Sequence, residues 1–402
     1  MFCKSKVKNK LNNVVIICNG FDDSSYKYLG YDFPLQTGGS EKNVVNNIFS
    51  LSEMYKIYLV ALGLTKSIKN DNSNITIIPM PSPYENGMFI FSLIQGIFKK
   101  NIFDILALRA DETVILIHNK LFVALLIKLL KPRYKLVLIL EGTFFALAWT
   151  PYAKNILTKI IYFLSSFIAI FLADRIITDK KDIWVYKWIT KNKTFHIPNS
   201  IETSKFSPNC LQSGRKSKLL SDLKDEDLLL LYVGRLNFIH DKNPQLLLKS
   251  FELVLKKNRN INLLVIGISE TDFNQLIKKY NCINLSNVYI IKSLPHEEVV
   301  PYYQAADLTL LTSRFEGTPY ALLESLACGT PCVSTDVIDK SIIINGLNGF
   351  IAKKSSPEEF SELVFKGLKL SKEIKSLNKS LLDPIYDLKY RKENLLRAIN
   401  SF

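Results

Sequence analysis

Two glutamates, Glu316 and Glu324, lie close together in the second half of the chain, just after the apolar run Leu308–Thr312. Thr318 suits the N-cap of a helix and Pro319 its first position, so we expect the run to lead through a short loop into a helix. The N–H groups at the start of such a helix attract phosphate, and carboxylates accept hydrogen bonds from hydroxyl groups. The stretch therefore predicts a site for a ligand that carries both phosphate and sugar hydroxyls.

The elements that must position this stretch alternate along the whole chain. Short apolar runs typical of strands are separated by helix-length segments, which indicates parallel sheets covered on both faces. Such sheets bind ligands beyond the carboxyl ends of their strands, so two sets of runs predict an α/β fold with two doubly wound, Rossmann-like parallel-sheet domains facing a cleft. The strand candidates are Val14–Cys18, Ile57–Ala61, Ile75–Pro79, Thr113–His118, Lys135–Leu140, Arg175–Thr178, Leu228–Val233, Asn262–Ile266, Val288–Lys292, Leu308–Thr312, Pro331–Thr335 and Gly349–Ala352.

The length of the chain also favours two domains, because 402 residues are too many for one ordinary hydrophobic core. Turn residues gather between Pro198 and Pro208 and mark a connector. We expect one domain at residues 1–200 and a second at 201–380. A C-terminal helix within residues 381–402 is expected to pack back on the first domain.

The net charge of +15 is concentrated in the first half, where residues 1–200 hold 25 Lys and Arg against 14 Asp and Glu. A basic half suggests an anionic partner, and no nucleic-acid-binding module is recognised, so an anionic membrane surface is the favoured partner. The alternative is an ordinary solvated surface. The segments Leu121–Lys131 and Lys154–Ala173 fit either an interfacial association or packing on the sheet. The longest apolar run, Ile160–Ala173, has 14 residues and is too short to span a bilayer, and no signal peptide is recognised, which predicts a cytoplasmic protein.

Glu316, seven residues, Glu324 and the following Ser-Leu-Ala-Cys-Gly-Thr-Pro-Cys-Val resemble the signature of family 4 retaining glycosyltransferases of GT-B architecture. The resemblance implies transfer of a sugar from a nucleoside diphosphate-sugar to an acceptor, with the acceptor on the first domain and the donor on the second. It also implies that Glu316 contacts the donor sugar and Glu324 the ribose. The other donor-binding residues implied in this stretch are Gly317, Thr318, Pro319, Tyr320, Ala321 and Leu322.

Two further segments resemble the same family. Gly234 and Arg235 match its Gly-Arg-Leu, whose arginine and a following lysine hold the diphosphate, and Gly267 matches a strand end near the nucleoside. Lys242 is the best match for the lysine, although it comes about two residues later than usual. Two cations suit a diphosphate that gains charge as it leaves, so we expect no divalent metal and no other cofactor. Asp22–Asp23 lacks the spacing of a metal-binding Asp-x-Asp.

The first half resembles the family less closely. Gly38 and Gly39 match a glycine loop that approaches the diphosphate-sugar, although an ordinary turn fits them equally well. Glu141 stands where many relatives carry a histidine, and it is either a hydrogen-bond partner of the sugar or acceptor or a structural carboxylate. His118 ends a strand and is either an acceptor-site residue or a histidine of the core.

The resulting prediction is a hexosyltransferase that acts on a glycan or lipid-linked acceptor in cell-surface polysaccharide synthesis. Two alternatives remain open at this point. One is a non-catalytic GT-B subunit that binds sugars or supports a partner enzyme, which the unusual Glu141 and the displaced Lys242 favour weakly. The other is a nucleotide-sugar epimerase of the same architecture, which needs no acceptor.

Overall fold

The computed structural model describes residues 11–19, 39–62, 74–80, 108–118, 121–140, 156–179, 192–208, 223, 226–236, 239–282, 285 and 287–402. The chain divides into two compact units, each with its own sheet. Unit 1 comprises Met1–Ile197 together with Arg391–Phe402, and unit 2 comprises Pro198–Tyr390.

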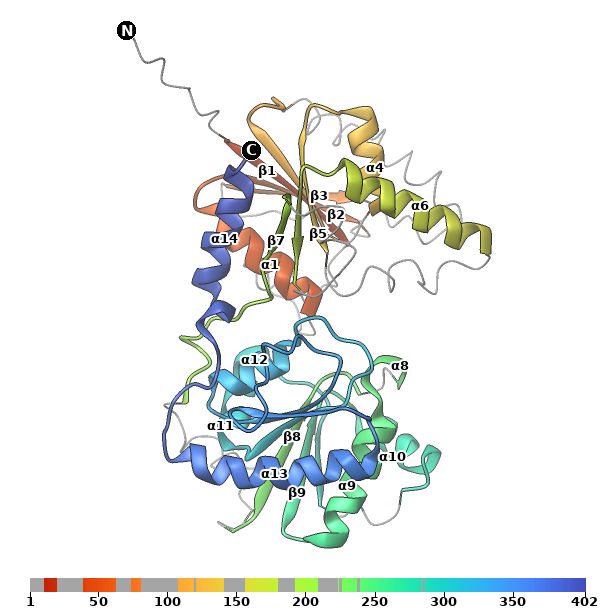
Figure 1. Cartoon of the computed structure of the whole chain (residues 1–402), viewed down its shortest axis with the longest axis vertical. Coiled ribbons are helices and arrows are strands. Elements are labelled where there is room, and N and C mark those ends of the chain that lie inside the picture. The colour runs from red at the N-terminus through yellow and green to blue at the C-terminus, as the bar shows by residue number, and fades with distance from the viewer. Residues whose placement is uncertain are drawn as a thin grey trace. The chain divides into compact units, whose positions relative to one another are not determined.

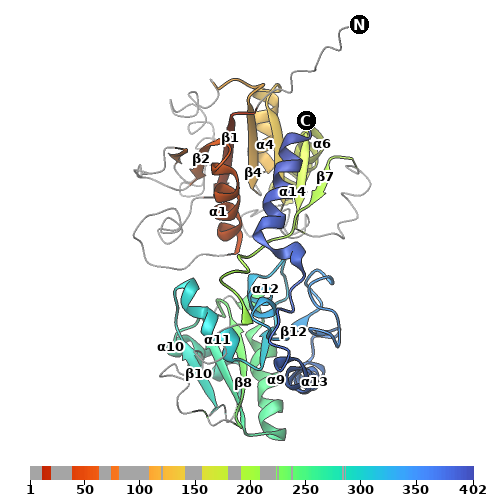
Figure 2. The ribbon, with the colours of Figure 1, turned by 90° about the vertical axis from the view of Figure 1, so that its left-hand side faces the viewer.

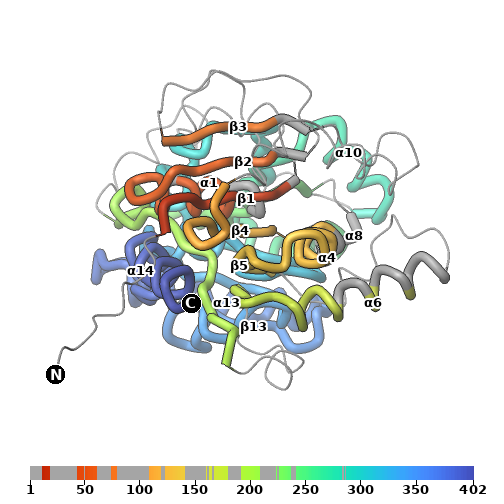
Figure 3. Tube along the Cα trace, turned by 90° about the horizontal axis from the view of Figure 1, so that it is seen from above, coloured from red at the N-terminus to blue at the C-terminus, as the bar shows by residue number. Residues whose placement is uncertain are grey.

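The sheet of unit 1 has seven parallel strands in the order β3-β2-β1-β4-β5-β6-β7. Figure 3 shows the first five strands side by side in this order. Six of them follow the predicted runs, whereas β7 was not predicted because it is three residues long and half-buried. The strands are β1 (Asn13–Asn19), β2 (Lys56–Leu62), β3 (Ile75–Met80), β4 (Thr113–His118), β5 (Lys135–Leu140), β6 (Arg175–Thr178) and β7 (Thr194–His196).

Helices cover both faces of this sheet, because alternate residues of its buried strands point to opposite sides. Val14 and Ile16 of β1 pack with α1 (Gly39–Ser52) and with α14 (Leu388–Asn400), which supplies Leu395, Ala398 and Ile399 to the same core. Val15 and Ile17 pack instead with α4 (Leu121–Leu130) and α6 (Ile156–Leu172). Figure 2 looks onto the face that carries α1 and α14.

The sheet of unit 2 has six parallel strands in the order β10-β9-β8-β11-β12-β13. This is the strand order of a doubly wound nucleotide-binding domain, with the order reversing between β8 and β11. The strands are β8 (Leu228–Val233), β9 (Ile261–Ile266), β10 (Val288–Ile291), β11 (Leu308–Leu311), β12 (Cys332–Thr335) and β13 (Gly349–Ala352). The predicted fold class, two parallel-sheet α/β domains, is therefore confirmed.

Two layers of helices cover this second sheet. α11 (Val300–Ala305) and α12 (Tyr320–Ala327) pack on one face, and α9 (Pro244–Lys257), α10 (Glu270–Lys279) and α13 (Pro357–Lys375) pack on the other. Figure 1 shows α12 and α13 on opposite sides of the strands. The short α8 (Ile239–Lys242) precedes α9, and the 3-10 turns η3 (His296–Val299) and η4 (Pro384–Tyr386) lie in connections.

None of the helices in the described part of the chain combines the length and the apolar character needed to cross a membrane.

Candidate functional site

The predicted site residues of unit 2 gather where the strand order reverses. β8 and β11 are neighbours, and the loops that follow them carry Arg235 and Glu316. Such a reversal leaves a crevice beyond the carboxyl ends of the two strands, because the crossover connections leave in opposite directions. Arg235 is exposed at the end of β8.

Hydrogen bonds join the loop after β8 to the loop after β11. The Thr312 hydroxyl donates to the Lys242 carbonyl at 2.9 Å, and the Arg314 amide donates to the Asp241 carbonyl at 2.7 Å. Asn243 turns the chain sharply with a left-handed φ of 48°, which asparagine tolerates, and Pro244 then begins α9. These contacts bring Lys242 to Glu316 although its position in the sequence is displaced.

Lys242 and Glu316 form the central ion pair of the site. Nζ of Lys242 lies 2.5 Å from Oε1 of Glu316, and both side chains are half-buried, with 26% and 14% exposed. The Ser313 hydroxyl donates to the same oxygen at 2.7 Å. A charge-assisted pair of this kind fixes both side chains in one geometry, while the second carboxylate oxygen keeps its acceptor capacity.

A tyrosine lies in the core beside this ion pair. Tyr232 of β8 is fully buried, and its hydroxyl has no hydrogen-bond partner among the described residues. Burial, reinforced by the negative charge of Glu316, raises the pKa of Tyr232 far above its usual value. The hydroxyl therefore stays protonated.

Glu324 is held from two sides inside the unit. Its side chain is only 3% exposed, Nε2 of His296 lies 2.6 Å from Oε1, and the Tyr303 hydroxyl donates to Oε2 at 2.9 Å. The ring of Phe206 packs on His296 with 5.1 Å between ring centroids. A buried carboxylate needs hydrogen-bond donors, so His296 and Tyr303, which we call the clamp, fix the orientation of Glu324.

The helix after Glu316 begins later than the sequence predicted. α12 starts at Tyr320, and its N-cap is Pro319 rather than Thr318. Pro319 has an extended ψ of 119°, and its carbonyl accepts the first helical bonds from the amides of Leu322 and Leu323. Thr318 therefore makes no N-cap bond; its side chain is buried and its carbonyl accepts a bond from Asn199. Since proline has no N–H, the backbone donors at this helix start come from Tyr320 and Ala321.

The remaining donor-site candidates differ in exposure. Gly317 and Ala321 are half-buried, so their backbone is near the surface of the unit. Tyr320 and Leu322 are buried in the core that α12 shares with the sheet, so their side chains serve packing. Gly267 closes β9, where its amide donates to the Ile291 carbonyl at 2.9 Å.

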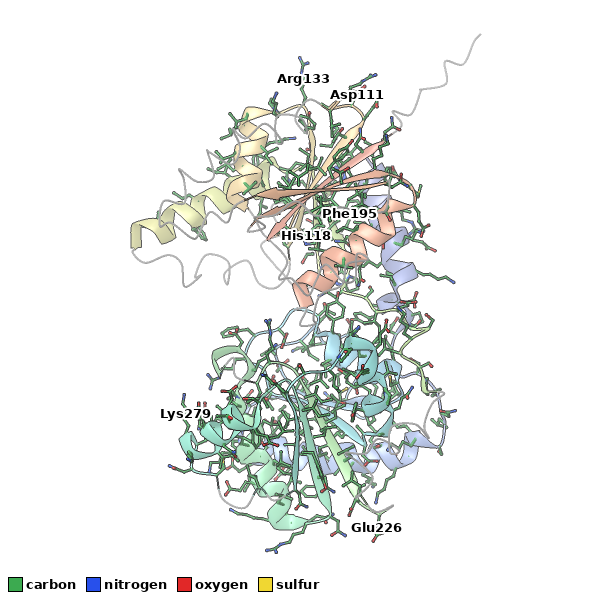
Figure 4. All side chains as sticks on the ribbon, turned by 180° about the vertical axis from the view of Figure 1, so that it is seen from behind. Asp111, His118, Arg133, Phe195, Glu226 and Lys279 are labelled. Carbon is green, nitrogen blue, oxygen red and sulfur yellow. The ribbon has the colours of Figure 1, made fainter. Side chains whose placement is uncertain are left out.

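In unit 1, His118 lies at the carboxyl end of β4 next to α1 (Figure 4). It is 3% exposed, and Nε2 lies 3.1 Å from the side-chain nitrogen of Asn47. The oxygen of the Asn47 amide accepts from Arg391 Nε at 3.0 Å, so its NH₂ group must donate to the histidine. This network joins three elements of unit 1, while a role for His118 at an acceptor stays a prediction.

Burial, with a smaller contribution from the Arg391 charge, lowers the pKa of His118 to about 3. Between an unfolded value of about 6.5 and this folded value, the unfolded chain binds a proton that the folded chain does not. The stability contributed by neutral His118 is therefore present above pH 6.5 and is lost as the pH falls. We expect the free energy of unfolding of the wild type, relative to His118→Gln, to fall by up to about 1.4 kcal/mol per pH unit below pH 6. Urea unfolding from pH 7 to pH 5 measures it, and a constant difference between the two proteins would contradict it.

Of the other three candidates in the first half, the structure describes only Gly39. Gly38 and Glu141 lie outside the described residues, and Gly39 is the first residue of α1. Their predicted roles stay predictions. The described residues contain no cluster of three or more His, Cys, Asp or Glu side chains that could hold a metal ion.

Sequence reasoning missed Ser313, His296, Tyr303 and Tyr232. Ser313 stands three residues before Glu316 and could have been found from its place in the same loop. His296 and Tyr303 come from the segment after β10 and from α11, and only the three-dimensional fold brings them to Glu324. Nothing in their spacing along the chain indicates that contact.

Comparison with known proteins identifies relatives of unit 2 and of the whole chain. Residues 217–380 match the family model described as glycosyl transferases group 1. The capsular polysaccharide biosynthesis glycosyltransferase CapM of Staphylococcus aureus is 26% identical over 51% of this chain and 55% of its own length. An uncharacterized glycosyltransferase of Haemophilus influenzae is 25% identical over 83% of this chain and 86% of its own. The Escherichia coli UDP-Gal:alpha-D-GlcNAc-diphosphoundecaprenol alpha-1,3-galactosyltransferase is 25% identical over 41% of this chain and 42% of its own.

Solved structures share the fold over almost the whole chain. Sucrose-phosphate synthase from Thermosynechococcus elongatus has a TM-score of 0.74 at 14% identity, covering 97% of this chain and 98% of that one. Anabaena HepE in complex with UDP-glucose has a TM-score of 0.65 at 13% identity, covering 97% and 100%. The fold therefore defines the class first: two doubly wound parallel-sheet units of the GT-B architecture.

The family match then narrows this class. Residues 217–380 match the glycosyl transferases group 1 model, and the chain as a whole has the fold of GT-B glycosyltransferases. The resemblance seen around Glu316 and Glu324 is confirmed at this level. The three relatives named above differ in how much of their length the chain spans, from 42% of the Escherichia coli protein and 55% of CapM to 86% of the Haemophilus protein.

Proposed function

We propose that the chain is a retaining glycosyltransferase of family 4 that moves a sugar from a nucleoside diphosphate-sugar to a glycan or lipid-linked acceptor in cell-surface polysaccharide synthesis. The observation that carries this proposal is the Lys242–Glu316 ion pair at the switch point of unit 2. The names of CapM and of the Escherichia coli relative support the kind of acceptor, and the UDP-glucose bound to HepE supports the kind of donor.

The cations of the site act on the departing diphosphate. Arg235 and Lys242 follow β8, and the amides of Tyr320 and Ala321 stand at the start of α12. As the bond between the sugar and the diphosphate breaks, negative charge grows on the phosphate oxygens, and preorganised donors stabilise that charge. The diphosphate competes with Glu316 for the Lys242 ammonium. Before the donor binds, the half-buried ion pair keeps both side chains in place.

Each of the two carboxylates then binds a different part of the donor. Glu316, released from part of its interaction with Lys242, accepts hydrogen bonds from the sugar hydroxyls near the reacting carbon. Glu324, held by the clamp, accepts from the ribose. The acceptor oxygen bonds to the anomeric carbon on the face from which the diphosphate leaves, and the hydroxyl proton passes to a departing phosphate oxygen, so the sugar keeps its anomeric configuration.

Because two cations and helix-start amides meet the diphosphate charge, the proposal needs no divalent metal. We expect transfer to continue at an unchanged rate after treatment with EDTA. Initial rates before and after chelation, with magnesium added back to one sample, measure this. A rate that collapses with EDTA and returns with magnesium would place a metal at the diphosphate.

The overall function is tested with a panel of labelled nucleotide-sugars, each incubated with and without a membrane lipid extract. Release of nucleoside diphosphate that depends on the extract, with label moving to the acceptor, supports transfer. Binding without turnover would indicate a non-catalytic subunit, and an isomerised donor without any acceptor would indicate an epimerase.

The clamp yields a separate prediction about affinity. Tyr303→Phe removes one donor to the Glu324 carboxylate, so we expect UDP to bind about 10-fold more weakly, corresponding to about 1.4 kcal/mol. His296→Ala is expected to have an effect of the same size. Titration calorimetry with UDP measures both, and Tyr302→Phe is the matched control because Tyr302 is the neighbouring tyrosine on α11. Equal affinities of the Tyr303→Phe and Tyr302→Phe proteins would show that the clamp does not position Glu324 for the nucleotide.

A further inference from the structure

One helix of unit 1 carries an apolar stripe on its exposed side. Six large apolar side chains of α6 are between 39% and 65% exposed, and they recur at intervals of three and four residues. This spacing places them on one face of the helix over three turns. They are Ile160, Phe163, Leu164, Phe167, Ile168 and Phe171, and we call them the α6 stripe.

The stripe is not needed to attach α6 to its own unit. Ala169, Ile170 and Ala173 at the end of the helix are buried in the core that α6 shares with α4 and the sheet. α6 has 17 residues against 10 in α4, and it extends beyond α4 (Figure 1). A soluble surface rarely leaves so many large apolar side chains together, so the stripe marks a docking surface.

The end of α4 extends this surface. Leu129 and Leu130 are 63% and 59% exposed. The ion pair between Lys128 and Asp174, at 2.6 Å, holds this last turn of α4 beside the C-terminal end of α6. Apolar side chains from two helices therefore lie at the same edge of unit 1.

The charge of the sequence segment that contains α4 and α6 indicates the partner of the stripe. Residues 119–175 contain eight Lys or Arg and two Asp or Glu, and neither α4 nor α6 contains an acid. Lys131 and Arg133 are exposed directly after α4. Lys193 donates to the carbonyls of Ile170, Phe171 and Ala173 at 2.6–3.0 Å, which places a cation at the C-terminal end of α6.

We infer that the α6 stripe inserts into the interfacial layer of an anionic membrane, with α6 lying in the plane of the membrane. Aromatic and aliphatic side chains on one face with lysines and arginines around them suit this position. A second copy of this basic unit fits less well, because it would bring like charges together. The existence of this surface does not depend on the proposed function. Only its use, which is to bring unit 1 to a lipid-linked acceptor, rests on that function.

Sedimentation with lipid vesicles tests this inference on the full-length chain. We expect binding to vesicles of phosphatidylcholine mixed with phosphatidylglycerol, and release as the salt concentration rises from about 0.1 to about 0.5 M. The double variant Leu164→Glu with Phe171→Glu is expected to partition at least about 10-fold less, because it places two charges at the inserted face. Met54→Glu with Leu377→Glu is the matched control, since both residues are more than half exposed and lie outside the surface.

Three results would overturn the inference: equal binding of the two double variants, equal binding of the wild type to vesicles of phosphatidylcholine alone, or a stripe variant that only converts a dimer to monomers in sedimentation. Thermal unfolding of both variants checks that they fold. Sugar transfer to a soluble or detergent-dispersed acceptor is measured separately. Vesicle binding without transfer would contradict the proposed function alone, and transfer without vesicle binding would contradict the membrane surface alone.

Discussion

Replacing Glu316 by glutamine is expected to lower the rate of sugar transfer by about 100- to 1,000-fold. The amide keeps the shape of the side chain but removes the charge that we propose to face the sugar, together with the charged partner that lies 2.5 Å from Lys242 Nζ. The change acts on the transition state, in which a preorganised charge matters most. Initial rates of nucleoside diphosphate release at saturating donor and acceptor measure the effect.

Glu362→Gln provides the control for this substitution. Glu362 is an exposed acid on α13 in the same unit, so its replacement changes the net charge equally without touching the site. Both variants should unfold near the wild-type temperature. If Glu316→Gln transfers sugar as fast as Glu362→Gln, Glu316 does not act at the reacting sugar.

Replacing Gly267 by alanine is expected to destabilise unit 2 by about 3 kcal/mol or more. Gly267 has a φ of +117°, and a Cβ at this position would lie 2.3 Å from the carbonyl oxygen of Gly234. Both the collision and the backbone conformation disfavour a side chain, and the collision is with backbone that cannot rotate away. The strand ends that precede Arg235 would have to separate, so UDP binding should be lost together with stability.

Gly346→Ala separates the two causes. Gly346 has a φ of +79°, but nothing lies within 4 Å of its added Cβ. Only the conformational penalty applies there, about 1–2 kcal/mol. Urea unfolding of both variants measures the difference. Equal destabilisation of the Gly267→Ala and Gly346→Ala proteins would contradict the close approach of Gly267 to Gly234.

Much of the fold followed from the sequence because the strands are apolar on both faces. β4 and β5 carry polar residues only at their ends, and their apolar interiors, buried on both sides, leave little choice of sheet type. The three residues of β7 gave no such signal. The alternation of strands and helices predicts parallel sheets but not the order of their strands, since periodicity does not say which strands become neighbours.

The candidate site was predicted less completely. Glu316, Glu324 and Arg235 were predicted as site residues because they stand in recognisable local patterns. The contact between Glu324 and His296 joins residues 28 positions apart, and it depends on how α12 packs against the segment after β10. The start of α12 was misplaced because Thr318 and Pro319 match the usual N-cap and first helical residues, whereas Pro319, with an extended ψ of 119°, is the N-cap in the structure.

The position of the donor diphosphate is tested most directly by comparing the affinities of UDP and uridine by calorimetry in the wild type and in Lys242→Met. We expect the wild type to bind UDP much more tightly than uridine. In the variant, this advantage should shrink by about 10- to 100-fold while uridine binds unchanged, because each charge-assisted hydrogen bond contributes about 1.5–3 kcal/mol. An undiminished preference for UDP in Lys242→Met would contradict the assignment of the diphosphate to the switch point of unit 2.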